Sequence, residues 1–178
     1  MAYAISIRSD NDSSDPIRAL WGTCGALESS PSMEVLRYPP HITLVIYDEI
    51  NMLDLVPVFE AATTHLSSTT IRFESLGYFE APHAIVLWAV PTLPDTIPSA
   101  HKLIHSKIDV NLCRPHYRPG SWVPHCSLAT SIGLPRRAEA IALASRPIDP
   151  FEVTFDVADC VSFPPIEVLH EKALPSSA

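Results

Sequence analysis

The sequence is poor in glycine and in long hydrophobic runs. Only 5 of its 178 residues are glycine, whereas 18 are proline. Because proline ends elements and holds its neighbours extended, this composition predicts many short elements with stiff connections. No apolar run reaches the roughly 18 residues that a transmembrane helix needs, and residues 1–8 lack the basic start and long apolar core of a signal peptide. We therefore expect a soluble, cytoplasmic protein.

Positive charge is also scarce. The chain has 12 Lys and Arg residues against 20 Asp and Glu residues, which gives a net charge of −8. Binding along a nucleic-acid backbone needs many Lys and Arg contacts, so a surface for long nucleic acids is not expected. A small nucleotide or an RNA end stays compatible with this charge, because it needs only a local site.

Cysteine occurs without the spacing of a metal or redox site. The four cysteines are Cys24, Cys113, Cys126 and Cys160. None of them forms a Cys-x-x-Cys pair, so a zinc site or a dithiol redox centre is not expected. Reduced thiols are the expectation for a cytoplasmic protein, although the sequence leaves a disulfide open.

The pattern of apolar residues predicts one domain over residues 1–178 with alternating strands and helices. Strands are expected at 3–8, 41–46, 70–79, 84–90, 122–129, 151–161 and 166–172. Helices are expected at 16–27, 99–110 and 135–145, and Asn51 is expected to cap a further helix that buries Leu53, Val56, Phe59, Ala62 and Leu66. We expect two lobes to meet near residues 91–98 and residues 175–178 to form a mobile tail.

One short motif occurs twice. The first copy is Pro40-His41-Ile42-Thr43-Leu44, and the second is Pro124-His125-Cys126-Ser127-Leu128. Each copy begins a predicted strand, in which residues i and i+2 point to the same face roughly 6–7 Å apart. Each histidine therefore shares a face with the hydroxyl residue two positions later, and the apolar residues of the motif share the opposite face.

The two motif copies lie in halves that match. His41 and His125 are 84 residues apart, and Phe79 and Phe163 have the same separation. Each half reads helix, motif strand, helix, hairpin. A period this long indicates a duplicated, two-lobed domain and not a solenoid. The prediction is an α+β, bilobal fold with a pseudo-two-fold axis and a central cleft.

Across such an axis the motif strands would face each other, with His41, Thr43, His125 and Ser127 on the floor of the cleft. An imidazole with a pKa near 6.5 exists in both forms close to neutrality, so one histidine can act as a general base and the other as a general acid. The hydroxyl groups can donate hydrogen bonds to phosphoryl oxygens. This set needs no metal and suits hydrolysis of a strained cyclic phosphodiester.

With these motifs the sequence resembles the 2H phosphoesterase superfamily, which is named for two His-x-(Thr/Ser)-x motifs and includes 2′-5′ RNA ligase-like proteins and cyclic nucleotide phosphodiesterases. The resemblance covers nearly the whole chain. It implies that each lobe is an antiparallel sheet with helices on its outer face. It also implies a metal-independent phosphodiesterase with no cofactor, whose catalytic residues are His41, Thr43, His125 and Ser127.

The resemblance further implies a substrate class. Family members commonly open 2′,3′-cyclic phosphates of nucleotides or RNA ends and usually leave a 2′-phosphate. By analogy, His41 is expected to protonate the departing 3′ oxygen and His125 to activate water, although the sequence leaves the two roles interchangeable. Alternatives are an enzyme acting on 2′-5′ linkages or cyclic oligonucleotides, and a non-catalytic nucleotide-binding module. The presence of both motifs favours an enzyme, which we expect to be a monomer.

A basic and aromatic loop precedes the second motif and is the candidate substrate-binding segment. Its rings and cations could stack a base and neutralise a phosphate, although packing explains the rings equally well. Tyr47 is added because regular alternation from Thr43 places it on the face of the cleft. The candidate substrate-binding residues are Tyr47, His116, Tyr117, Arg118 and Trp122.

His101 and His105 have the i, i+4 spacing of half a helical metal site. No acidic third ligand lies near them in the sequence. We therefore expect them to lie on the surface of a helix and not to bind a metal.

Overall fold

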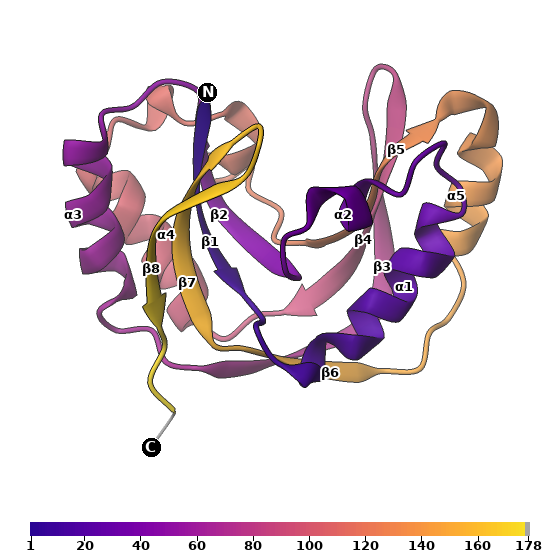
Figure 1. The fold of residues 1–178 in the computed structure, drawn as a ribbon, viewed down its shortest axis with the longest axis horizontal. Coiled ribbons are helices and arrows are strands. Elements are labelled where there is room, and N and C mark those ends of the chain that lie inside the picture. Colours follow the sequence, from indigo (N-terminus) through magenta and orange to yellow (C-terminus); the bar gives the residue numbers. More distant parts are fainter. Residues whose placement is uncertain (177–178) are drawn as a thin grey trace.

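A computed structural model describes residues 1–176, and in it eight strands form one antiparallel sheet. The strands are β1 (Ala2–Arg8), β2 (His41–Tyr47), β3 (Thr69–Glu80), β4 (Ala84–Thr92), β5 (Cys126–Gly133), β6 (Phe151–Phe155), β7 (Val157–Phe163) and β8 (Glu167–Ala173). Their order across the sheet is β6-β3-β4-β5-β2-β1-β7-β8 (Figure 1).

Two groups of helices pack on the two halves of this sheet. The helices are α1 (Asp15–Gly25), α2 (Ser32–Leu36), α3 (Met52–Thr63), α4 (Thr96–Lys107) and α5 (Arg137–Ala144). Helices α1 and α2 pack on β5, and α5 packs on β3 and β4. At the other end of the molecule, α3 packs on α4 and β7 (Figure 1). The α+β fold with two sheet lobes is confirmed.

The strand order is palindromic about the centre of the sheet. There β2 and β5 are neighbours, and they are joined at the pair Ile42 and Cys126. Adding the same 84 to the residue numbers of β1 gives residues of β4, and adding it to the end of β3 gives the end of β7. These strands are therefore counterparts in the two repeats. If each strand is replaced by its counterpart, with β6 and β8 as a further pair, the strand order becomes the same order read from the other end. The predicted pseudo-two-fold axis therefore passes between the two motif strands.

Each lobe contains strands from both repeats. The expectation that the first half contains a whole hairpin is therefore wrong, because β4 is the counterpart of β1 and belongs to the second repeat. Strand β3 of the first repeat pairs with β4 of the second, and β7 of the second repeat pairs with β1 of the first. Residues 91–98, where the lobes were expected to meet, hold the end of β4, a connection over 93–95 and the start of α4. Here the chain leaves the lobe of β3 and β4 and joins the helical layer of the other lobe, because α4 packs on α3.

The chain crosses between the lobes again at Asp156, so the strand expected over 151–161 is wrong. Strand β6 pairs with β3, whereas β7 pairs with β1. Between them, the Asp156 N–H donates to the carbonyl of Arg8 at 3.1 Å, and the Leu174 N–H donates to the carbonyl of Asp156 at 2.8 Å. The break is thus fixed by partners far away in the sequence.

Three further local expectations need correction. The second motif strand begins at Cys126 and not at Trp122, because Pro124 has no N–H to give to a ladder. The short helix α2 lies in a segment for which no helix was expected. In α3, which Asn51 caps as expected, Leu55 is buried and Leu53 is 81% exposed. The buried face of the helix therefore begins at Leu55, two positions after the expected Leu53.

The ends of the chain and its cysteines complete the fold. The Pro175 carbonyl accepts a hydrogen bond from the Ser68 N–H at 2.8 Å, whereas residues 177 and 178 of the expected tail lie outside the described residues. All four cysteines are buried and free. Within residues 1–176, no helix is long and apolar enough to cross a bilayer.

Candidate active site

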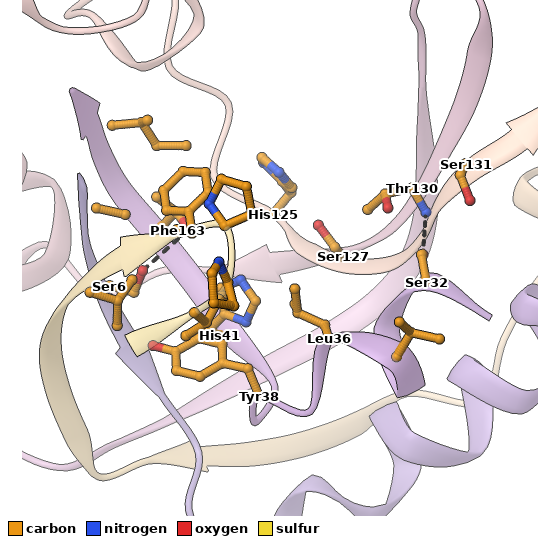
Figure 2. A pocket seen from close by; sticks show the side chains of 18 of the residues that line it. Ser6, Ser32, Leu36, Tyr38, His41, His125, Ser127, Thr130, Ser131 and Phe163 are labelled. Atoms are coloured by element: carbon orange, nitrogen blue, oxygen red, sulfur yellow. Dashed lines mark hydrogen bonds between the residues drawn. The ribbon is translucent and has the colours of Figure 1, made fainter. Parts of the chain in front are cut away.

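The four motif side chains line one cleft of about 620 Å³ at the centre of the molecule. Within each motif the two apolar residues after proline are buried, whereas the histidine and the hydroxyl residue are partly exposed. Because β2 and β5 are neighbours, this alternation turns both polar pairs to the same side of the sheet. Figure 2 shows His41, His125 and Ser127 around the cleft.

Both imidazoles are held in the same way. The His41 Nδ1 lies 2.9 Å from the carbonyl oxygen of Pro39, and the His125 Nδ1 lies 2.8 Å from that of Val123. Because a carbonyl oxygen only accepts, Nδ1 of each neutral ring carries the proton, and Nε2 keeps a free lone pair. The proline before each histidine holds the carbonyl-bearing residue extended, which explains its place in the motif. Each motif therefore presents one nitrogen ready to take up or release a proton.

Burial lowers the pKa of both histidines. For His41 it lowers the pKa to about 4, opposed by the hydrogen bond to Pro39 and reinforced by the nearby charge of His125. Burial also lowers the pKa of His125, opposed by its bond to Val123. The charge of His125 thus disfavours protonation of His41, so the two rings are not expected to be charged together. Both rings are therefore predominantly neutral at pH 7 in the unliganded protein.

The main chain next to each motif hydroxyl is fixed by a tryptophan. The indole Nε1 of Trp122 donates to the carbonyl oxygen of Thr43 at 3.1 Å, and that of Trp21 donates to the carbonyl oxygen of Ser127 at 3.0 Å. The side chain of Thr43 has a further contact, because its Oγ1 lies 3.3 Å from the hydroxyl of Ser6 in β1. Both hydroxyl residues thus sit on a backbone that is anchored from behind the cleft.

A bulge in β2 decides which later residue of the strand reaches the cleft. Ser6 pairs with Thr43 and Ile5 pairs with Val45, so Leu44 is the extra residue. After the bulge Ile46, and not Tyr47, lines the cleft. Tyr47 is fully buried, which differs from its expected place among the substrate-binding residues.

Aromatic rings pack against the edges of both imidazoles. The ring centroids of Tyr38 and His41 are 4.8 Å apart, and those of Phe79 and His125 are 5.1 Å apart. Phe79 in turn stacks on Trp88 at 4.9 Å. This stack needs Gly77, since a Cβ there would lie 2.5 Å from the Trp88 ring. The orientation of His125 therefore depends on a glycine that does not touch it.

Behind His41 lies a buried ionic network. The hydroxyl of Tyr38 donates to Asp159, with distances of 2.7 and 2.6 Å to its two carboxylate oxygens, and the Nε of Arg8 donates to the same carboxylate at 2.8 Å. Asp159 is fully buried. Burial raises the pKa of Asp159 to about 6, although both partners favour its charged form. The network fixes the Tyr38 ring against His41.

In the loop before the second motif, some candidate residues face the open space and others stabilise the loop itself. Tyr117 lines the cleft. His116 lines an adjoining space of about 630 Å³ that shares Tyr117, His125, Ser127 and Thr130 with it. Arg118 is turned away and donates to the carbonyls of Cys113 and Asn111 at 2.8 and 2.9 Å. Trp122 lies behind Thr43, so only two of these four candidates reach the open space.

His101 and His105 support this loop. Each Nε2 donates to the same carbonyl oxygen, that of Tyr117, at 2.8 and 3.0 Å. His101 also stacks on Trp122 with a centroid distance of 4.2 Å. Contrary to the expected surface position, His101 is buried. Across the described part of the chain, no three His, Cys, Asp or Glu side chains are grouped to hold a metal ion.

Several residues of the cleft were not expected from the sequence. Among them are Ser6, Leu36, Tyr38, Thr130 and Phe163. The sequence did mark Phe163, because it lies 84 residues after Phe79 and the two residues therefore occupy equivalent positions in the two halves. Figure 2 shows Phe163 on the side of the cleft where Ser6 lies, and Thr130 beside Ser32 at the opposite side. The others are brought in by pairings and loops that no local pattern marks.

Solved structures share this fold at low sequence identity. TT0787 of Thermus thermophilus has 15% identity and a TM-score of 0.61, with 100% of both chains covered. E. coli LigT complexed with 3′-AMP has 16% identity and a TM-score of 0.59, covering 98% of this chain and 99% of LigT. LigT complexed with NADP+ has 14% identity and a TM-score of 0.58, covering 98% and 97%. No curated protein matches the chain.

At these identities the solved structures show the fold, and the family is assigned by a match to a family model. The model of the 2′-5′ RNA ligase superfamily matches residues 10–163, which include both motifs and most of the sheet. Together with the paired motifs in one cleft and the palindromic sheet, this match shows that the chain belongs to the 2′-5′ RNA ligase superfamily, the group of the 2H phosphoesterases.

Proposed function

We propose that the protein is a metal-independent phosphodiesterase that hydrolyses 2′,3′-cyclic phosphates to 2′-phosphates. The observation that carries the proposal is the matched orientation of His41 and His125 in one cleft. Each ring donates through Nδ1 to the carbonyl two residues earlier and keeps Nε2 free, beside Thr43 and Ser127. Two proton carriers and two hydroxyl donors around one space suit an in-line displacement at phosphorus.

The proposed reaction balances with water alone. His125 takes a proton from the attacking water as the new P–O bond forms, and His41, which the bound anionic phosphate helps to keep protonated, gives its proton to the 3′ oxygen as the P–O3′ bond breaks. The hydroxyls of Thr43 and Ser127 donate to the nonbridging oxygens, whose charge grows in the transition state. The product keeps its phosphate on the 2′ oxygen, and the pair has exchanged one proton between its members.

A nucleotide is a suitable occupant in size and chemistry. The cleft of about 620 Å³ falls in the range of small-molecule sites, and its wall combines aromatic rings with hydroxyl groups. Crystal structures of LigT, which shares the fold, contain 3′-AMP and ATP. We propose that the enzyme acts as a cytoplasmic monomer, where its four buried thiols stay reduced.

A second candidate is cleavage or formation of 2′-5′ linkages. It is favoured by the continuation of the cleft past His125 into the adjoining space of about 630 Å³. A linear diester has a group on each side of phosphorus, and the two spaces meet at His125 and Ser127. A third candidate, a nucleotide-binding module without turnover, would not need two free imidazole nitrogens.

A product assay separates these candidates. The purified protein is incubated with a 2′,3′-cyclic mononucleotide, an RNA that ends in a cyclic phosphate, a 2′-5′ dinucleotide and a 3′,5′-linked cyclic dinucleotide. We expect the cyclic mononucleotide to yield the 2′-phosphate with chelator present. Exclusive cleavage of the dinucleotide would support the second candidate, and saturable binding without any product would support the third.

A further inference from the structure

The two spaces around the histidines are walled mainly by rings, aliphatic groups and hydroxyls, and Glu80 and His116 also line the second of them. We call the cleft of about 620 Å³ the first arm and the adjoining space of about 630 Å³ the second arm. The first arm is walled by Leu36, Tyr38, Val161, Phe163 and Ile166, with Ser32 and Ser131 at one side. The second arm is walled by Phe79, Pro82, Val86 and Val123. Flat, uncharged groups fit such walls, because they bury apolar surface and can use the hydroxyls.

The arginines beside the two arms are already neutralised. Arg114 lies over the ring of Phe163, a wall of the first arm, with its guanidinium carbon 5.6 Å from the ring centroid. It also forms an ion pair with Asp48 at 2.5 Å. Beside the second arm, Arg137 contacts both oxygens of Glu80 at 2.6 and 2.9 Å. Each guanidinium is thus paired with a carboxylate, which balances its positive charge before a ligand phosphate arrives.

Carboxylates lie close to the walls as well. Glu28 accepts hydrogen bonds from the Ser131 hydroxyl at 2.9 Å and from the Ser131 N–H at 2.7 Å, and Ser131 lines the first arm. Glu80 itself lines the second arm. A second anionic group on a ligand would therefore meet negative charge at either end of the cleft. Like charges brought together in this way oppose binding of that group.

We propose that the substrate carries a single phosphate, the reacting one, and is otherwise uncharged: a nucleoside 2′,3′-cyclic phosphate with a free 5′-hydroxyl, and not an RNA end or a nucleotide with further phosphates. The inference rests on the proposed function, which it narrows. The histidines and motif hydroxyls receive the one phosphate, and an arm receives the uncharged nucleoside.

The test compares two pairs of ligands that differ in one 5′-phosphate. Turnover is measured with adenosine 2′,3′-cyclic phosphate and its 5′-phosphorylated form, and binding is measured by calorimetry with adenosine 2′-phosphate and adenosine 2′,5′-bisphosphate, at one pH and ionic strength. We expect the 5′-phosphate to lower kcat/KM and affinity by about tenfold or more each. Equal values for the two members of both pairs would overturn the inference and leave the proposed function standing.

Three variants that each remove one carboxylate test whether charge beside the arms causes the preference for a single phosphate. D48N removes the charge that neutralises Arg114 beside the first arm, and E80Q does the same for Arg137 beside the second. E139Q is the matched control, because it releases Arg136, which lines neither arm. We expect D48N or E80Q to raise affinity for the bisphosphate severalfold and E139Q to leave it unchanged.

The outcomes separate the two proposals. If neither D48N nor E80Q changes the preference, or if E139Q changes it as much, charge at the arms does not set specificity and the inference is overturned. If the wild-type protein cleaves neither cyclic phosphate, the proposed function fails. The calorimetric comparison of monophosphate and bisphosphate then still decides whether the cleft admits one phosphate.

Discussion

The indole of Trp122 donates a hydrogen bond to the carbonyl oxygen of Thr43 at 3.1 Å. The two residues lie 79 positions apart, and the bond joins the loop before the second motif to the strand of the first. Trp122 thus stabilises the strand of the first motif, whereas the sequence left substrate binding and packing equally open for it.

Replacing Trp122 by Phe tests this positioning role. The variant keeps a ring to stack on His101 but loses the donor to Thr43. A hydrogen bond of this kind contributes about 1 kcal/mol, so we expect kcat to fall about fivefold with KM little changed. Steady-state kinetics gives the two constants. A rise in KM alone would instead indicate that Trp122 binds substrate directly.

The roles of the two histidines can be separated by the leaving group. We expect His41→Ala and His125→Ala each to lower hydrolysis of a 2′,3′-cyclic nucleotide by ~10²-fold or more. Nitrophenoxide departs without being protonated. With a nitrophenyl diester as the substrate, the loss of hydrolysis rate in His41→Ala should therefore shrink to about tenfold or less, whereas the rate of His125→Ala should stay impaired.

Circular dichroism of both histidine variants controls for folding. The reverse pattern with the nitrophenyl diester would exchange the two roles without removing the mechanism. Wild-type rates in either folded variant would rule out the paired mechanism altogether.

The lowered pKa values of the pair predict where activity is greatest. The active form holds one proton on two rings, so it is most populated between the two macroscopic pKa values. Because burial lowers the pKa of both His41 and His125 below the ordinary value, the maximum of kcat/KM should lie below about pH 6.5. Activity should fall at higher pH as the acid loses its proton, and at lower pH as the base gains one.

A profile of kcat/KM from about pH 4 to 9 brackets the ordinary pKa of histidine and measures this. The cyclic phosphate is a diester with no titration in that range, so the two limbs report the protein. A plateau that extends well above neutrality or a rate that keeps rising would contradict the prediction.

Gly77 offers a stability test coupled to the site. A methyl group there would lie 2.5 Å from the ring of Trp88, which packs against Phe79 and His125. Overpacking of this kind costs about 1–3 kcal/mol, so Gly77→Ala should lower both the free energy of unfolding and kcat.

Gly22→Ala is the matched control, because Gly22 lies in α1 with nothing within 4 Å of its added Cβ. It should stabilise the helix by up to about 1 kcal/mol. Urea unfolding monitored by tryptophan fluorescence measures both variants. An unfolding midpoint of Gly77→Ala equal to wild type would show that the Trp88 ring moves freely.

Much of the fold followed from local patterns. The paired motifs predicted which residues of each motif strand face the cleft, and proline marked the ends of many elements. Tyr47 was misplaced because regular alternation was extended through a bulge, where Leu44 is the extra residue. A bulge arises from pairing with β1, and nothing in the sequence of β2 marks it.

Other errors have the same origin in distant partners. The break at Asp156 reflects hydrogen bonds to Arg8 and Leu174, not a local breaker. His101 was expected at the surface because no acidic third metal ligand lies near it in the sequence, yet it is buried and its partner is the carbonyl of Tyr117. Long-range pairings decide such positions, and a single sequence contains no record of them.

The exchange of strands between the repeats governs how the chain can be divided. A cut in the turn at residues 81–83 separates β3 from β4, the strand with which it pairs from Arg72 to Glu80. The first fragment then carries β3, which belongs to the lobe of β4 and β5, and the second carries β7 and β8, which belong to the lobe of β1 and β2. The two fragments are thus complementary, and neither contains a whole lobe. Since His41 lies on one fragment and His125 on the other, mixing two inactive fragments would reconstitute catalysis only as they fold onto each other.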